Sequence, residues 1–331
     1  MKISEIIGID VSKLTLDCCD HNSGRQEAFD NTFGAIEAMA DWSLETTGTS
    51  KGHLLFVFEH TGLYTYKLIQ YLSEKGYYYC IVSGLEIKRS LGITRGKDDR
   101  ADAKRIAQYG YRLRDELKPN QVNTQTLEGL KRLMSVRHKL VVQRAGYKVS
   151  LKEQQRILDE KKESVLFSVQ RKVIQTLDTE IQVIEKELDR IIEEDPDLQK
   201  LYRLITSVKG IGKITARFLI VYTGGFTQFE TWRKFASYCG IAPFPYRSGT
   251  SVKGRTKVSH LANKEGKSLL SMCAVSAIQC SPEMKTYYEK RVERGKNKMS
   301  TLNIIRNKLL SRAFAVAQRG TPYVNTMKYA A

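Results

Sequence analysis

Short apolar segments that end on an acidic residue, separated by segments with helical spacing, constrain the fold of this chain more than any other feature. Ile6–Ile9 ends at Asp10, and His53–Phe58 ends at Glu59. Both segments have the length and composition of buried strands, and Tyr77–Val82 is a further one. Because strands alternate with helical patterns, the chain is expected to begin with an α/β domain.

Additional strands and helices complete this expected domain. Leu14–Cys19 is predicted to be the second strand, and Gln26–Thr32 pairs with it across a His-Asn-Ser-Gly turn. Three meandering strands are thus followed by alternating helices and strands, which is the order of an RNase H-like (RuvC-like) fold, predicted for residues 1–115. The helices are expected at residues 36–44, 63–72, 85–92 and 99–110.

Residues 116–197 differ in kind and predict a helical coiled-coil spacer. Residues 124–195 contain no proline, and their apolar positions step by four and three, as in a coiled-coil seam. The seam predicts at least a helical spacer, and self-association through it is a further possibility. The seam residues are Leu177, Ile181, Ile184, Leu188 and Ile191.

The net positive charge of +18 comes entirely from the C-terminal part of the chain. Residues 201–331 hold 23 Lys and Arg but 5 Asp and Glu, whereas the first 200 residues hold 31 of each. The basic residues are dispersed among small and aromatic residues and do not form one amphipathic helix. This pattern favours a domain that binds nucleic acid over one that binds an anionic membrane.

Other features of the composition exclude several protein classes. No apolar run is long enough to span a membrane, and the N-terminus lacks a signal-peptide pattern. The six cysteines show no paired spacing, which argues against a zinc ribbon and a disulfide framework. We expect a cytoplasmic protein with reduced thiols.

A mostly α-helical domain is expected at residues 198–331. Val208–Lys213 resembles a helix-hairpin-helix turn, which would present backbone N–H groups to a phosphate, although a Gly-x-Gly between helices can also be an ordinary tight turn. Gly240–Gly249 contains two prolines and is expected to be a loop. The candidate nucleic-acid-binding residues of this domain are Lys209, Lys213, Arg247, Lys253, Arg255 and Lys257.

Four carboxylates are candidates for a metal site. Asp10 and Glu59 end neighbouring strands, and Asp99 and Asp102 lie three residues apart on a predicted helix. Four carboxylates held close together repel one another unless a cation lies between them. Oxygen ligands select hard cations such as Mg²⁺ or Mn²⁺. Taken singly, each acid could have an ordinary structural role instead. Asp10 could cap a turn, Glu59 could be a surface charge at the edge of a site, and Asp99 and Asp102 could lie in the solvent-exposed first turn of a helix. Asp98 could replace Asp99 as a ligand, but we prefer Asp99 and assign Asp98 to the N-cap.

Several motifs resemble those of one mobile-element family. Ile-Gly-Ile-Asp10-Val-Ser-Lys, Phe-Glu59-His-Thr-Gly and Lys-Asp-Asp99-Arg-Ala-Asp102-Ala are similar to the motifs of the DEDD insertion-sequence recombinases, insertion sequence family 110. This family includes the Piv-type invertases and is guided by a bridge RNA. Its third motif usually has Thr where this chain has Asp98. The segments around residues 210–216 and 235–249 resemble the second conserved domain of the family.

The resemblance implies a RuvC-like catalytic domain, a coiled coil and a transposase domain that supplies a serine nucleophile. That serine corresponds to Ser248, beside Gly249 and flanked by Arg247 and Lys253. Cations bound by the carboxylates would activate its weakly nucleophilic hydroxyl. Without the resemblance Ser248 could be only a turn residue, and Ser251 and Ser259 are its nearest competitors.

The leading hypothesis is a transposase, or site-specific recombinase, that cleaves and rejoins DNA through a phosphoserine. Its expected partners are double-stranded donor and target DNA, a structured guide RNA and further copies of the chain, as a dimer or tetramer, in a prokaryotic cytoplasm at the nucleoid. A structure-specific, Holliday-junction-type endonuclease that uses the same carboxylates with water is the alternative. A third possibility is a non-enzymatic binding protein, which requires all four acids to be incidental.

Overall fold

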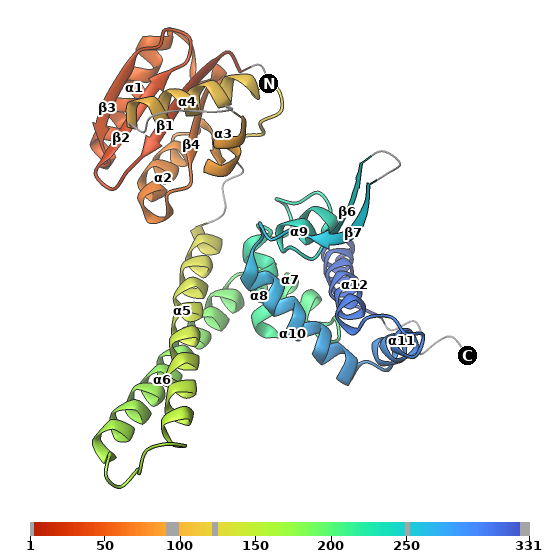
Figure 1. Cartoon of the computed structure of the whole chain (residues 1–331). Helices are drawn as coiled ribbons and strands as arrows, with labels where there is room; N and C mark the ends of the chain where they lie inside the picture. The colour runs from red at the N-terminus through yellow and green to blue at the C-terminus, as the bar shows by residue number, and fades with distance from the viewer. Residues whose placement is uncertain (1–2, 91–98, 121–124, 249–251, 325–331) are drawn as a thin grey trace. The chain divides into compact units, whose positions relative to one another are not determined.

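The chain forms two compact units, Met1–Val122 and Asn123–Ala331, as seen in a computed structural model (Figure 1). The structure describes residues 3–90, 99–120, 125–248 and 252–324. The first unit is a sheet with helices, and the second is mostly helical. This confirms the expected order of a mixed α/β region followed by a helical region.

The first unit contains a five-stranded sheet in the order β3-β2-β1-β4-β5. Strands β1, β2 and β3 are antiparallel, whereas β4 and β5 run parallel to β1. All the expected strands are present. The elements are β1 (Glu5–Val11), β2 (Thr15–Asp20), β3 (Gln26–Asp30), α1 (Phe33–Thr47), η1 (Lys51–His53), β4 (Leu54–Glu59), η2 (Gly62–Thr65), α2 (Tyr66–Glu74), β5 (Tyr78–Val82), α3 (Gly84–Ser90) and α4 (Asp99–Arg112).

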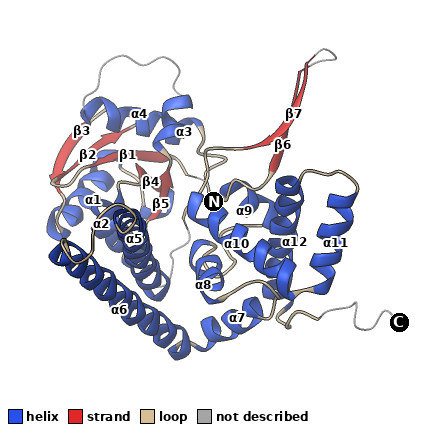
Figure 2. Ribbon diagram, turned by 60° about the horizontal axis from the view of Figure 1, so that its bottom comes forward, coloured by secondary structure: helices blue, strands red, loops and turns tan. Residues whose placement is uncertain are grey.

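Apolar side chains on both faces of the sheet create a three-layer unit (Figure 2). On one face, Ile7 and Phe56 pack with Ile36 of α1 and Leu68 of α2. The opposite face packs against α3 and α4, with Ile106 of α4 in the same cluster as the strand residues. Strands covered on both faces are apolar along their length, which explains the continuous apolar run of β4.

Helix α4 lies unusually close to β1 because Gly8 has no side chain. A Cβ atom at Gly8 would lie 2.2 Å from the backbone nitrogen of Ala107 and 2.5 Å from the carbonyl oxygen of Ala103. Near the other end of α4, a Cβ at Gly110 would lie 2.8 Å from side-chain atoms of Ile6 and Val57. Helix α4 is therefore antiparallel to β1, and its first turns lie toward the carboxyl ends of β1 and β4.

The second unit combines a long helical hairpin with a group of shorter helices and a two-stranded sheet. No helix in the described part of the chain is long and apolar enough to cross a membrane. The elements are α5 (Gln125–Gln154), α6 (Ser164–Glu194), α7 (Pro196–Thr206), α8 (Lys213–Tyr222), α9 (Trp232–Tyr238), β6 (Pro243–Ser248), β7 (Val252–Val258), α10 (Lys264–Cys280), α11 (Pro282–Glu293) and α12 (Lys298–Arg319).

The apolar seam predicted in α6 is partly covered within the chain. Leu188 is fully buried and belongs to the same core cluster as Leu130 and Met134 of α5. Ile181 is also buried, with an exposed fraction of 4%, and α5 packs along α6. The same cluster continues into α7, α8, α10 and α12, so α5 and α6 share a core with the C-terminal helices.

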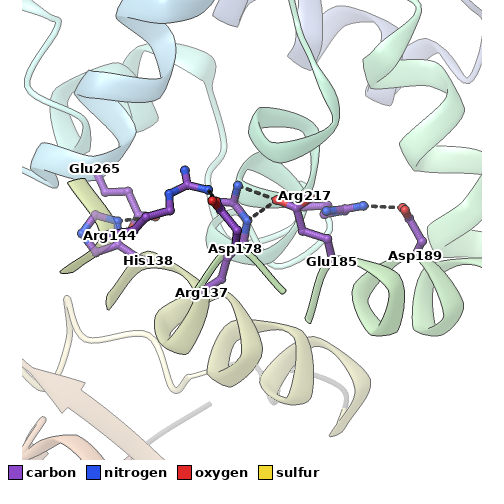
Figure 3. Close-up of polar contacts among 8 residues, drawn as sticks. All are labelled: Arg137, His138, Arg144, Asp178, Glu185, Asp189, Arg217 and Glu265. Atoms are coloured by element: carbon purple, nitrogen blue, oxygen red, sulfur yellow. Dashed lines mark hydrogen bonds and ion pairs between the residues drawn. The ribbon is translucent and has the colours of Figure 1, made fainter. Parts of the chain in front are cut away.

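Ion pairs link the helical hairpin to itself and to the C-terminal helices (Figure 3). Within the hairpin, Arg137 of α5 binds Glu185 of α6 at 2.6 Å. Arg217 of α8 is almost fully buried and is paired with Asp189 of α6. The remaining pairs drawn there are Arg144 with Asp178 and His138 with Glu265.

The Pro-rich segment expected to be a loop is a β-ribbon, and that expectation was wrong. Strands β6 and β7 pair antiparallel, from Pro243 opposite Val258 to Ser248 opposite Val252. Proline has no N–H group to donate, but each strand of a two-stranded sheet has one edge that pairs with no other strand of the sheet. Pro243 and Pro245 are therefore compatible with β6, although they indicated a loop in the sequence.

We predict that Gly8→Ala destabilises the first unit by about 3 kcal/mol, because the new methyl group overlaps backbone atoms that cannot rotate away. Gly34→Ala is the matched control, since a Cβ at Gly34 meets no atom within 4 Å. Chemical unfolding followed by circular dichroism measures both. Equal stability of the two variants would contradict the close packing of α4 on β1.

We predict that Asp189→Ala lowers the free energy of unfolding by about 3 kcal/mol, because it leaves the buried Arg217 guanidinium without its carboxylate. Arg217 has an exposed fraction of 2%. As a control, Glu187→Ala removes a solvent-exposed partner of Arg190 and should cost much less, because water screens this pair. Urea denaturation compares the two, and a cost at Asp189 no larger than the control would show that the pair is dispensable.

Candidate active site

Asp10 and Glu59 lie side by side at the ends of adjacent parallel strands. In the β1–β4 register Ile9 is opposite Phe58, so the next residue on each strand is one of these two acids. Neighbouring strands lie about 4.8 Å apart, which brings the two residues within reach of a common ligand. The predicted convergence of these strand ends is therefore present in the structure.

Both acids lie on the face of the sheet that α4 covers. Side chains two residues apart on a strand share a face. Gly8, two residues before Asp10, lies against α4, and Val57, two residues before Glu59, packs in the cluster that includes Ile106 of α4. Asp10 is half-buried and Glu59 is exposed. The pair is therefore next to the helix that carries the other two predicted acids.

The carboxylate of Glu59 lies against Gly84, the first residue of α3. A Cβ atom at Gly84 would be 2.2 Å from Oε1 of Glu59 and 2.4 Å from Oε2. The missing side chain thus leaves room for this carboxylate beside the end of β4. Gly84 could not be identified as part of the site from the sequence, because no local sequence pattern shows that this glycine contacts the distant Glu59.

Helix α4 begins at Asp99, and Asp102 follows in its first turn. Nη1 of Arg105 lies 2.6 Å from Oδ1 of Asp102, and both side chains are partly buried. Asp102 immediately precedes Ala103, whose carbonyl lies against Gly8 of β1. Asp98, the alternative ligand, lies outside the described residues.

A further acid, Asp17 of β2, lies directly opposite Asp10 in the antiparallel pair of β1 and β2. Asp17 is half-buried, and Thr15 donates a 3.4 Å hydrogen bond to its Oδ2 atom. Directly opposite residues share a face of the sheet, so Asp17 is on the side of α4 as well. Counting the pairing outward from the short turn after Val11 would have identified it in the sequence.

The described side chains do not form a closed metal site. Within residues 3–90, 99–120, 125–248 and 252–324 no group of three or more His, Cys, Asp or Glu has the geometry to hold a metal ion. The structure brings Asp10 and Glu59 together and places α4, with Asp102 in its first turn, near them. This arrangement supplies only oxygen ligands, the type that hard divalent cations prefer.

The predicted serine is the last residue of β6, where it pairs with Val252 of β7. Arg247 and Lys253 are paired next to it. Of the competing serines, Ser251 lies outside the described residues, and Ser259 is engaged in a local turn. There its hydroxyl oxygen lies 3.1 Å from the backbone nitrogen of Leu261.

The other predicted nucleic-acid-binding residues are exposed where the structure describes their side chains. Lys209 lies in the turn between α7 and α8, Lys213 begins α8, and Lys257 lies on β7. The Nζ atom of Lys213 is 3.8 Å from Oδ2 of Asp189. Gly212 caps α8 without a side-chain hydrogen bond, so its first backbone amides remain compatible with a phosphate.

Cysteine nucleophiles are disfavoured by burial. Burial raises the pKa of the Cys80 thiol to about 11 and that of Cys239 to about 12. The reactive form of cysteine is the thiolate, which such groups do not populate near neutral pH. Five cysteines are buried free thiols, and Cys280 alone is exposed.

Comparison with known proteins identifies the family. Residues 7–160 match the DEDD transposase family of the IS110 type, and residues 202–289 match the family described as "Transposase IS116/IS110/IS902 family". A pilin gene-inverting protein of Moraxella lacunata is 30% identical over 325 residues, which cover 96% of this chain and 97% of that protein. An IS110 protein of Streptomyces coelicolor is 31% identical over 144 residues, 44% of this chain and 34% of that protein. The chain therefore belongs to the IS110 family of DEDD transposases, which are enzymes of DNA recombination.

Proposed function

We propose that this transposase cleaves and rejoins DNA with a carboxylate-bound metal site and a serine nucleophile. The observation that carries the proposal is the adjacency of Asp10 and Glu59 on the face of the sheet covered by α4. Two strand-end acids beside a helix that begins with two more are suited to phosphodiester chemistry.

The first unit is assigned an RNase H-like (RuvC-like) fold. Its support is the strand order β3-β2-β1-β4-β5, with an antiparallel meander followed by two parallel crossovers. The acids at the ends of the central strands β1 and β4 occupy the edge where crossover loops leave the sheet. Active sites of open α/β sheets form at the carboxyl ends of such strands.

The proposed cation is Mg²⁺ or Mn²⁺, held by Asp10, Glu59, Asp99 and Asp102. Asp99 is preferred over Asp98 because it begins α4 one turn before Ala103, which packs on β1. Arg105 would have to share or release Asp102 for this carboxylate to bind a metal. The bound ions would supply charge neutralisation at the phosphate and a lower pKa for an attacking hydroxyl.

Ser248 is the proposed nucleophile. Its Oγ atom forms a bond to the phosphorus atom while the bond to one deoxyribose oxygen breaks, and that oxygen takes up a proton. Rejoining reverses the step, with a deoxyribose hydroxyl of the new partner strand displacing the serine oxygen. Because Ser248 and the carboxylates belong to different compact units, the reaction requires both units to engage the same phosphodiester.

Double-stranded donor and target DNA and a structured guide RNA are the proposed partners. The support for nucleic acid is the charge of residues 201–331 together with the exposed Lys209, Lys213 and Lys257. Phosphate backbones of either polymer bind such surfaces, and base pairing would then select the sites. Arg247, Lys253 and Arg255, on the β6–β7 ribbon, complete the proposed contact set. The reaction would take place at the nucleoid, in a prokaryotic cytoplasm.

A dimer or tetramer is proposed because recombination must hold two duplexes. The coiled-coil hairpin α5–α6 is the proposed contact. Part of its seam is covered within the chain, but other apolar side chains of the two helices are exposed, including Val142 of α5 with 57% and Val165 of α6 with 73%. Such residues favour association with a second copy.

We predict that Ser248→Ala reduces strand transfer by at least about 1,000-fold and abolishes the covalent protein–DNA adduct, because the attacking oxygen is lost. The assay uses a plasmid that carries the noncoding DNA flanking the gene, with adduct detection on denaturing gels. Ser259→Ala is the control and should retain activity. If Ser248→Ala still cuts DNA at the wild-type rate, the chain is instead a hydrolytic, structure-specific endonuclease.

We predict that Asp10→Asn lowers Mg²⁺-dependent cleavage by more than about 100-fold, beyond the loss typical of groups that only orient a metal ligand. Mn²⁺ should raise the unfolding temperature of the wild-type protein but not that of Asp10→Asn, and the variant should still bind DNA. Asp41→Asn, on the exposed side of α1, is the control. Loss of DNA binding with an unchanged metal response would refute the metal site.

A further inference from the structure

Tyr246 of β6 is a large, exposed aromatic residue in a basic ribbon. Its exposed fraction is 68%, and that of Phe244 on the same strand is 48%. The strands β6 and β7 extend away from the helices of the second unit (Figure 1). Exposure of two aromatic residues on one projecting strand leaves them available to a partner.

The ring of Tyr246 is accommodated by a glycine on the paired strand. Tyr246 is opposite Gly254 in the β6–β7 register. A Cβ atom at Gly254 would lie 2.6 Å from Cδ1 of Tyr246, and 3.2 Å from its carbonyl oxygen. Because Gly254 has no side chain, the ring of Tyr246 can lie against the backbone of β7 while most of the side chain remains exposed.

The charge of the ribbon indicates the chemistry of that partner. Residues 243–258 contain four basic residues and no acidic residue. Lys257 is exposed on β7. Aromatic rings interleaved with cations are suited to a nucleic-acid strand, whose bases stack on the rings while its phosphates meet the charges. An apolar protein surface would leave these cations without partners.

Tyr246 also lies two residues before Ser248 on the same strand. Residues two apart occupy one face of a strand and are separated by about 7 Å. We propose that Tyr246 is a positioning residue that stacks on a base of the DNA strand attacked at Ser248. The inference deepens the proposed function and rests on it for the role of the serine, but the stacking itself is tested by binding.

The test measures the affinity of the full-length protein for a fluorescently labelled thymidine oligonucleotide. Tyr246→Ala should weaken binding about tenfold, whereas Tyr246→Phe, which keeps the ring, should remain within about twofold of the wild type. On an oligonucleotide of abasic sites, wild type and Tyr246→Ala should bind equally. Tyr147→Ala, which removes an exposed tyrosine of α5, is the matched control and should bind as the wild type.

The salt dependence separates stacking from charge. Tyr246→Ala should leave the slope of log affinity against log salt unchanged, whereas Lys257→Ala should reduce its magnitude by about one. Wild-type affinity for Tyr246→Ala would overturn the proposal, as would equal losses for Ala and Phe or an equal loss on the abasic strand.

A second readout separates this inference from the proposed function. Tyr246→Ala should slow formation of the protein–DNA adduct, and Tyr246→Phe should restore it. If Ser248→Ala keeps wild-type strand transfer while Tyr246→Ala still weakens binding to the oligonucleotide, the serine assignment fails and the stacking stands. If Tyr246→Ala leaves both binding and adduct formation unchanged while Ser248→Ala abolishes the adduct, the stacking fails and the serine assignment stands.

Discussion

The close contact between α4 and β1 determines the geometry of the first unit. Gly8 allows the backbone of α4 at Ala103 and Ala107 to approach the strand, and Gly110 allows the same near Ile6 and Val57. Two contacts along one helix define both its direction and its position along the strand. Because of them the first turn of α4, with Asp102, lies toward the strand ends that carry Asp10 and Glu59. The close packing at Gly8 and Gly110 is therefore required for the proposed site to form.

In the second unit, a long helical hairpin formed by α5 and α6 is joined to a basic group of shorter helices. Its apolar core runs from α5 and α6 into α7, α8, α10 and α12. The buried pair of Arg217 and Asp189 adds a specific polar link between α8 and α6. A buried charge left without its partner is costly, so this link favours one packing of the helices over alternatives. The β6–β7 ribbon extends from this group of helices, between α9 and α10 in the chain.

Much of the fold could be predicted from the sequence, and the errors have physical reasons. The strands and helices of the first unit could be predicted from the spacing of apolar residues and from the lengths of the apolar segments. The β-ribbon was mistaken for a loop because Pro243 and Pro245 usually break secondary structure, and their tolerance on an edge is a property of the pairing. Asp17 was overlooked although the pairing counted from the turn after Val11 places it opposite Asp10. Gly84 could not be identified, because its proximity to Glu59 arises from the placement of α3.

The sequence by itself determined the family, the order of mixed and helical regions, and the residue types that can bind a cation or a phosphate. These properties depend on local pattern and composition, which are readable along the chain. Only the tertiary structure decided that Asp10 and Glu59 are neighbours on the α4 side, that the seam of α6 is partly covered by α5, and that Tyr246 lies across Gly254. These are contacts between distant segments, and they exist only once the register and the helix packing are set.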